Sequence, residues 1–255
     1  MLPATIEVNG RRYIHRQVFK HDFFAATALY EADAPFEDQV DRVILKVQRQ
    51  APFLLFPLGW IGRLLAARER SAFERLAGIP GIPRLLGGWG PTGLIREYVE
   101  GHTLAEVDRV NDDFHPRLRE LIGAIHARDM AYVDLEKPGN ILVGEDGRPH
   151  LFDFQISWYW PRRWGGALWP ARAIRRRLQS GDLYHLIKLQ RRTRPDQLTP
   201  EALAASYRKP WFVRTYNLLT RPFTRFRRRI LGRLDPQRGR GERGRTSDNR
   251  IMGGV

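Results

Sequence analysis

The chain has 255 residues and a formal net charge of +15, with 42% apolar and 28% charged residues. This length suffices for a buried core, and this composition indicates a folded protein rather than a disordered one. The absence of cysteine excludes a disulfide framework, a thiolate metal site and a cysteine nucleophile. The N-terminus lacks the features of a secretory signal, and no apolar stretch is long enough to cross a bilayer, so we expect a cytoplasmic protein.

Charge is divided unevenly along the chain. Residues 1–155 hold 19 Lys and Arg against 22 Asp and Glu, whereas residues 156–255 hold 24 against 6. A strongly basic second part favours a polyanionic partner, which is nucleic acid, an anionic membrane surface or a phosphorylated substrate.

Apolar and polar residues alternate in the first part of the chain, as they do in antiparallel strands. The predicted strands are Thr5–Val8, Tyr13–Phe19, Ala25–Tyr30, Arg42–Gln48, Arg84–Trp89 and Thr92–Tyr98. The dipeptide Asn9-Gly10 predicts a tight turn after the first strand. Between the fourth and fifth strands, apolar residues at helical spacing predict a helix over Arg63–Ala77, which ends before a glycine and a proline.

The second part of the chain is mainly helical. Pro116–Asp129 carries its apolar residues on one face, and short strands at Ile141–Val143 and His150–Phe152 flank a glycine-rich turn. Residues 235–255 are rich in glycine and arginine and lack apolar periodicity, so they are predicted to be disordered. The pattern therefore predicts an α+β fold.

Three polar residues between Tyr132 and Gln155 suit phosphoryl transfer. Asn140 follows Asp134 by six positions, and Asp153 lies on the far side of the predicted hairpin. One carboxylate can orient an incoming hydroxyl group, while an amide oxygen and a second carboxylate hold Mg²⁺ against nucleotide phosphates. Asp134 and Asn140 alone would also suit a turn. Asp153 lies between two phenylalanines, where an unpaired carboxylate is costly to bury.

In type and order these residues resemble the protein-kinase superfamily, with its catalytic loop H-R-D-L-x-x-x-N and its metal motif D-F-G. The resemblance makes Asp134 the catalytic aspartate and Asn140 and Asp153 the ligands of Mg²⁺. It also places Lys137 near the transferred phosphate. Asp182 matches the aspartate that braces the catalytic loop.

Upstream residues extend the resemblance. Val43–Lys46 resembles the V-A-I-K strand, which implies that Lys46 contacts the α- and β-phosphates of ATP and pairs with Glu69, with Glu74 as the alternative. Glu97-Tyr98-Val99 resembles the hinge whose backbone pairs with adenine, which assigns Glu97 and Val99 to ATP binding.

The resemblance implies a bilobal protein-kinase-like fold. Its parts would be a β-rich N-lobe over residues 1–96, a hinge over 97–101, a shortened and mostly helical C-lobe over 102–234, and the tail 235–255. Several departures leave open a pseudokinase that binds partners without catalysis. The turn Lys20–Phe24 has no glycine, Tyr132-Val133 replaces His-Arg, and Gln155 replaces the glycine of D-F-G.

Three segments suit contact with an anionic membrane surface. Ile156–Gln179 and Trp211–Arg233 combine aromatic residues with arginine, and Pro52–Ile61 is apolar. The alternative is that the aromatic residues are core and the arginines are the solvated face of the same helices.

With its short C-lobe, the chain resembles bacterial lipopolysaccharide-core kinases of the Kdo and heptose type, whose acceptor is a sugar hydroxyl on a membrane glycolipid. We therefore expect an ATP- and Mg²⁺-dependent kinase that acts on a glycolipid or sugar and lies in the cytoplasm or on the inner face of the plasma membrane. A Ser/Thr protein kinase with a protein substrate is the main alternative. A nucleic-acid-binding protein, which the Arg-Gly tail suggests, is disfavoured because it needs none of the three polar residues.

Overall fold

The computed structural model describes residues 2–21, 25–34, 40–48, 59–160 and 169–207. Several predictions therefore fall outside the described residues: the centre of the glycine-free turn, most of Pro52–Ile61, the basic segment Trp211–Arg233 and the tail 235–255. Contacts group residues 1–206 into one unit, and the description below concerns this unit.

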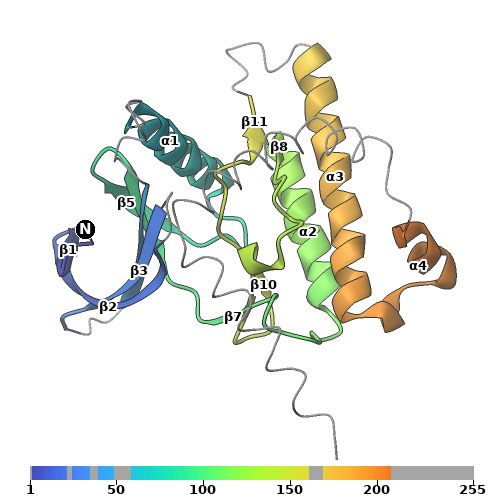
Figure 1. Cartoon of the computed structure of the whole chain (residues 1–255), viewed down its shortest axis with the longest axis horizontal. Coiled ribbons are helices and arrows are strands. Elements are labelled where there is room, and N and C mark those ends of the chain that lie inside the picture. The colour runs from blue at the N-terminus through green and yellow to red at the C-terminus, as the bar shows by residue number, and fades with distance from the viewer. Residues whose placement is uncertain (1, 22–24, 35–39, 49–58, 161–168, 208–255) are drawn as a thin grey trace, which may run out of the picture. The chain divides into compact units, whose positions relative to one another are not determined.

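A six-stranded antiparallel sheet forms the first part of the fold and curls around an apolar cluster (Figure 1). Its spatial order is β1-β2-β3-β4-β6-β5. The strands are β1 (Thr5–Val8), β2 (Arg11–His21), β3 (Ala25–Ala32), β4 (Arg42–Gln48), β5 (Leu85–Trp89) and β6 (Gly93–Glu97). The predicted turn at Asn9-Gly10 joins β1 to β2, and both residues have the positive φ that tight hairpin turns require.

Alternation along β4 sends its side chains to two environments. Val43 and Leu45 are buried in the cluster that the sheet encloses. Lys46 and Gln48 lie on the opposite face and bond to helix α1 (Gly59–Leu76), which packs against β4, β5 and β6. Polar side chains of β4 are thus held between the sheet and α1.

The second part contains helices α2 (Phe114–Ala127), α3 (Trp169–Thr193) and α4 (Pro200–Tyr207). Helices α2 and α3 pack side by side (Figure 1). Their buried apolar faces join the end of α1 in the larger core cluster, which includes Phe73, Leu118, Ile122, Ile125 and Leu186. Single 3-10 turns are η1 (Pro138–Asn140) and η3 (Pro195–Gln197).

Two small sheets complete the second part. One contains β7 (Gly101–Thr103), β9 (Ile141–Gly144) and β10 (Pro149–Leu151) in the order β10-β9-β7. The other pairs β8 (Met130–Ala131) with β11 (Trp158–Tyr159). The observed architecture confirms the predicted α+β class.

The structure differs from the predicted elements in length and in short strands. Helix α1 begins four residues before the predicted start at Arg63, and the sequence pattern did not predict β7, β8 or β11. The segment Ile156–Gln179, expected at a membrane surface, contributes β11 with a buried Tyr159 and the first turns of α3. Within the described ranges, no helix combines the length and apolar character that a membrane crossing needs.

Candidate active site

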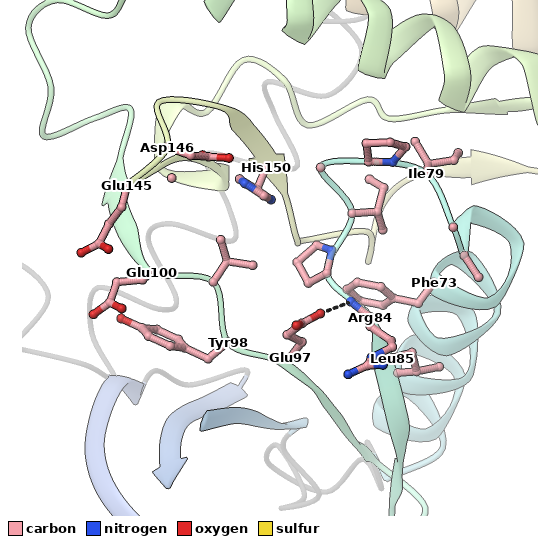
Figure 2. A pocket seen from close by; sticks show the side chains of 18 of the residues that line it. Phe73, Ile79, Arg84, Leu85, Glu97, Tyr98, Glu100, Glu145, Asp146 and His150 are labelled. Carbon is pink, nitrogen blue, oxygen red and sulfur yellow. Dashed lines mark hydrogen bonds between the residues drawn. The ribbon is translucent and has the colours of Figure 1, made fainter. Parts of the chain in front are cut away.

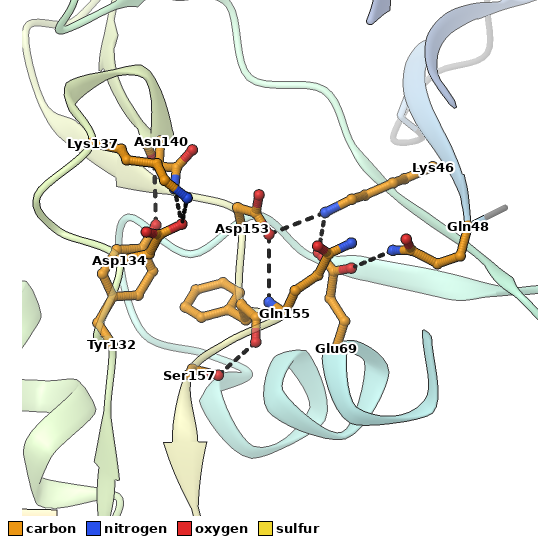
Figure 3. A network of polar contacts seen from close by, with 11 residues as sticks. Lys46, Gln48, Glu69, Tyr132, Asp134, Lys137, Asn140, Asp153, Gln155 and Ser157 are labelled. Atoms are coloured by element: carbon orange, nitrogen blue, oxygen red, sulfur yellow. Dashed lines mark hydrogen bonds and ion pairs between the residues drawn. The ribbon is translucent and has the colours of Figure 1, made fainter. Parts of the chain in front are cut away.

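A buried ion pair joins β4 to α1. The Nζ atom of Lys46 lies 2.7 Å from Oε1 of Glu69, whose side chain is 0% exposed (Figure 3). Burial by itself lowers the pKa of Lys46, but Glu69 and Asp153 together outweigh it, so that the pKa is raised and the lysine stays charged. The pair predicted between Lys46 and Glu69 is therefore present, and Glu74 has no part in it.

Gln48 is a third member of this cluster, which the sequence analysis missed. Its Nε2 donates to Oε2 of Glu69 at 3.3 Å, and the residue is only 3% exposed. Both oxygens of Glu69 are thus held from β4. The alternation of side chains along a strand could have identified Gln48, because it is two positions after Lys46 and therefore lies on the same face.

Asp153 reaches the same lysine from the second part of the chain. Its Oδ1 accepts from Lys46 Nζ at 3.1 Å and from the backbone amide of Gln155 at 3.4 Å. Burial alone raises the pKa of Asp153, but Lys46, the Gln155 amide and Lys137 lower it by more, so that the net pKa falls below its usual value. The other oxygen, Oδ2, accepts no hydrogen bond from the described residues.

The hairpin of β9 and β10 brings Asn140 and Asp153 to the same end. Leu151 pairs with Ile141, so Asn140, just before β9, and Asp153, two residues after β10, leave the hairpin together. Asn140 and Asp153 are 13 positions apart in the sequence, and the pairing of β9 with β10 brings them together. This is the juxtaposition that a shared cation would need.

Asp134 is held by two donors on one oxygen. Lys137 Nζ and Asn140 Nδ2 each donate to Asp134 Oδ2 at 2.7 Å (Figure 3). Burial is the main cause that raises the pKa of Asp134, and the nearby Asp153 adds to it while Lys137 opposes it. Oδ1 of Asp134 accepts no bond from the described residues and remains available to a hydroxyl group.

The backbone before Asp134 is strained and braced. Val133 has a φ of 71°, which is rare for a β-branched residue. Asp182, buried in α3, accepts from the amides of Tyr132 and Val133 at 2.8 Å each, and its Oδ2 also lies 2.9 Å from His126. The bracing role that the resemblance implied for Asp182 corresponds to these contacts.

The predicted hinge residues Glu97 and Val99 lie at the end of β6 and just after it. The carbonyl of Glu97 accepts a hydrogen bond from Arg96 Nη1 at 3.1 Å, and the carboxylate of Glu97 accepts from the amide of Arg84. Val99 makes no hydrogen bond with its backbone N–H among the described residues. Arg96 is only 8% exposed, and sequence reasoning missed it because an arginine in a strand usually points to solvent.

A separate hollow of about 730 Å³ lies beside this segment. Figure 2 shows its lining, which includes Phe73, Ile79, Glu97, Tyr98 and His150. None of the clustered residues Lys46, Glu69, Asp134, Asn140 or Asp153 lines it. We locate the candidate chemistry at the polar cluster, since charge, burial and hydrogen bonding converge there.

The donor set suits one kind of metal ion. Within the described ranges, no group of three or more His, Asp and Glu side chains could enclose a metal. Asn140 and Asp153 instead offer one amide and one carboxylate oxygen. Mg²⁺ is commonly held by one or two carboxylates together with phosphates and water, so the two residues fit a magnesium ion that arrives with a nucleotide.

Neither the models of known protein families nor the curated proteins contain a match to this chain.

Proposed function

We propose that the chain is a magnesium-dependent phosphotransferase of protein-kinase-like fold, which transfers the terminal phosphate of a nucleoside triphosphate to a hydroxyl group. The observation that carries the proposal is Lys46, which bonds at once to Glu69 of α1 and to Asp153, 107 positions away. Buried charged groups that are paired in this way are typical of functional sites, and a lysine in this position could contact the phosphates of a nucleotide.

Each residue of the cluster has a role in this reaction. Glu69 and Gln48 orient Lys46 toward the phosphates. Asn140 and Asp153 would hold the magnesium ion. The ion, when bound, neutralises phosphate charge. Asp134 orients the acceptor hydroxyl through Oδ1 and receives its proton as the oxygen–phosphorus bond forms and the nucleoside diphosphate leaves.

Positioning of the reactants and neutralisation of the phosphate charge would supply most of the rate enhancement. Lys137, which bonds to Asp134, would stabilise the negative charge of the transferred phosphate. Val133 and Asp182 hold the backbone of Asp134 in one conformation. A rigid array of this kind stabilises a transition state without reorganisation at the moment of reaction.

The acceptor we propose is a sugar hydroxyl on an anionic membrane glycolipid. Helix α3 supports a polyanionic acceptor, because its first turns expose Arg172, Arg176 and Arg177 together with Trp169 and Ile174. Residues 156–255 as a whole hold 24 Lys and Arg against 6 Asp and Glu. Arginine recognises phosphate, and exposed tryptophan is typical of membrane interfaces.

The test uses the purified full chain with Mg²⁺ and γ-labelled ATP or GTP, offered a bacterial glycolipid extract or generic proteins. Asp153→Asn and Asp134→Asn should each lower transfer at least a hundredfold. Asp108→Asn, at an exposed aspartate that bonds to none of the described residues, is the matched control and should retain the rate. Label in the lipid fraction supports the glycolipid acceptor, and label in the protein fraction supports a protein kinase. Undiminished transfer by Asp153→Asn, or nucleotide binding without any transfer, would overturn the proposal.

A further inference from the structure

The segment from Glu97 to Glu100 has half of its backbone groups already paired. The amide of Glu97 donates to Arg84 at 2.9 Å, and that of Tyr98 donates to Arg42 at 3.1 Å. The carbonyl of Glu100 accepts from the amide of Glu145 at 3.2 Å. Among the described residues, Val99 makes no backbone hydrogen bond. Val99 thus offers both its N–H and its carbonyl to a base that lies along this segment.

Arg96 donates a hydrogen bond to the carbonyl of Glu97, two positions before Val99. It is the next-to-last residue of β6, and it pairs with Ile44 of β4, so its side chain lies on the face of the sheet that carries Lys46. Its Nη1 donates to the Glu97 carbonyl at 3.1 Å. Its guanidinium carbon lies 4.9 Å from the ring centre of Phe152, which directly precedes Asp153. The guanidinium thus stands between the segment after β6 and the cluster that holds Lys46.

Burial and a ring contact hold this guanidinium in place. The residue is 8% exposed, and the ring of Phe152 provides a favourable cation–π contact. Burial lowers the pKa of Arg96 to about 10, while the negative charges of Glu69 and Asp153 oppose the shift. Arg96 is therefore charged at neutral pH. A guanidinium has only donors, and its remaining N–H groups have no acceptor among the described residues.

Resting on the proposed function, we propose that Arg96 is a specificity residue that makes the nucleotide site prefer a 6-oxopurine, such as guanine or hypoxanthine, to adenine. The oxygen at position 6 accepts hydrogen bonds from a guanidinium and from an amide, and the N1–H group next to it can donate to the Val99 carbonyl. Adenine presents an amino group at position 6. Its N–H groups would face the guanidinium, which is another donor, and the Glu97 carbonyl already accepts one hydrogen bond from it.

The preference should be large enough to measure directly. A buried donor that is left without an acceptor weakens binding by about tenfold to a hundredfold. We expect GTP and ITP to bind the full chain, with Mg²⁺ present, at least tenfold more tightly than ATP. ITP is the most informative ligand, because it differs from ATP only at the 6-oxo edge and lacks the 2-amino group of GTP.

The decisive variant is Arg96→Met, measured by titration of the same three nucleotides. It should remove the preference and bring the three affinities within about threefold of one another. Arg84→Met is the matched control, because Arg84 is exposed and lines the separate hollow beside the segment (Figure 2). The control should keep the preference for ITP.

Each outcome decides the question. Equal or tighter binding of ATP than of ITP by the unmodified chain overturns the role of Arg96 and leaves the proposed phosphotransferase intact if label is still transferred. A preference for ITP that survives Arg96→Met also overturns it. If Arg96→Met does not fold, as judged by thermal melting, the comparison of ATP with ITP on the unmodified chain still decides the base preference. No binding of any of the three nucleotides would overturn both proposals together.

Discussion

Replacement of Lys46 by methionine should destabilise the fold strongly. The substitution keeps most of the side-chain volume but leaves Glu69, which is 0% exposed, without its partner at 2.7 Å. Loss of one member of a buried ion pair costs about 3–5 kcal/mol. Gln48 still donates to Glu69. Burial is the main cause that raises the pKa of Glu69, and the charge of Arg96 opposes this shift. We therefore expect a loss at the lower end, about 3 kcal/mol in the free energy of unfolding.

A second substitution separates stability from function. In Lys46→Met/Glu69→Gln the buried charge is gone, and the amide can still contact Gln48, so at least half of the lost stability should return. Neither variant should bind Mg²⁺-nucleotide with the native affinity, because both lack the lysine.

Urea unfolding at pH 7.5, followed by tryptophan fluorescence, measures these differences if the slopes of the transitions agree. Glu69→Gln alone completes the double-mutant cycle. A loss below about 1 kcal/mol for Lys46→Met, or strictly additive effects in the cycle, would refute the reasoning, since a coupled buried pair predicts neither.

Three further predictions concern other parts of the structure. Burial and two nearby arginines lower the pKa of His115 from 6.5 to about 4, so the unfolded chain takes up a proton before the folded one as pH falls. The free energy of unfolding should drop by about 2–3 kcal/mol between pH 6.5 and pH 4; His115→Gln, which can still reach Thr193 Oγ1, should flatten this part of the curve, and an unchanged slope would contradict the assignment. Asp182→Asn should lower the free energy of unfolding by about 2–3 kcal/mol and slow phosphate transfer, because an amide nitrogen then meets the N–H of Val133 or its neighbour. A thermal melt measures the first effect and initial rates the second. A native rate would show that Asp182 does not position the loop. Burial raises the pKa of Asp134, so the decrease of kcat/KM on acidification should begin at a higher pH than an ordinary aspartate gives. A profile that is flat down to the ordinary range of aspartate would exclude Asp134 as the base.

The candidate site illustrates how far residue type and order can predict chemistry. Asp134, Asn140 and Asp153 were identified because their types suit a hydroxyl and a cation, and Lys46 because it lies in an apolar strand. Their hydrogen bonds could not be predicted. The sequence does not indicate that Asn140 and Lys137 donate to the same oxygen of Asp134, since that depends on the path of the chain through η1.

Residues that act through the tertiary structure were missed. Gln48 and Arg96 are polar residues in strands, and such residues usually face solvent. Here α1 covers the face of β4 that carries Gln48, and the end of β10 brings Phe152 over Arg96. Both become buried because of elements that are distant in sequence.

Local pattern determined the elements whose signal is repeated many times. The alternation in β4, the turn at Asn9-Gly10 and the apolar face of α2 each rest on several neighbouring residues, and the structure contains all three. The two-residue strands β8 and β11 have no such signal, because a strand this short exists only through its partner, and their pairing joins residues 27 or more positions apart. The sequence by itself therefore determined the α+β class and the kinds of side chain available to the candidate site. Only the tertiary structure decided which of them meet, because burial and hydrogen bonding between distant segments depend on how the sheet, α1 and the β9–β10 hairpin pack together.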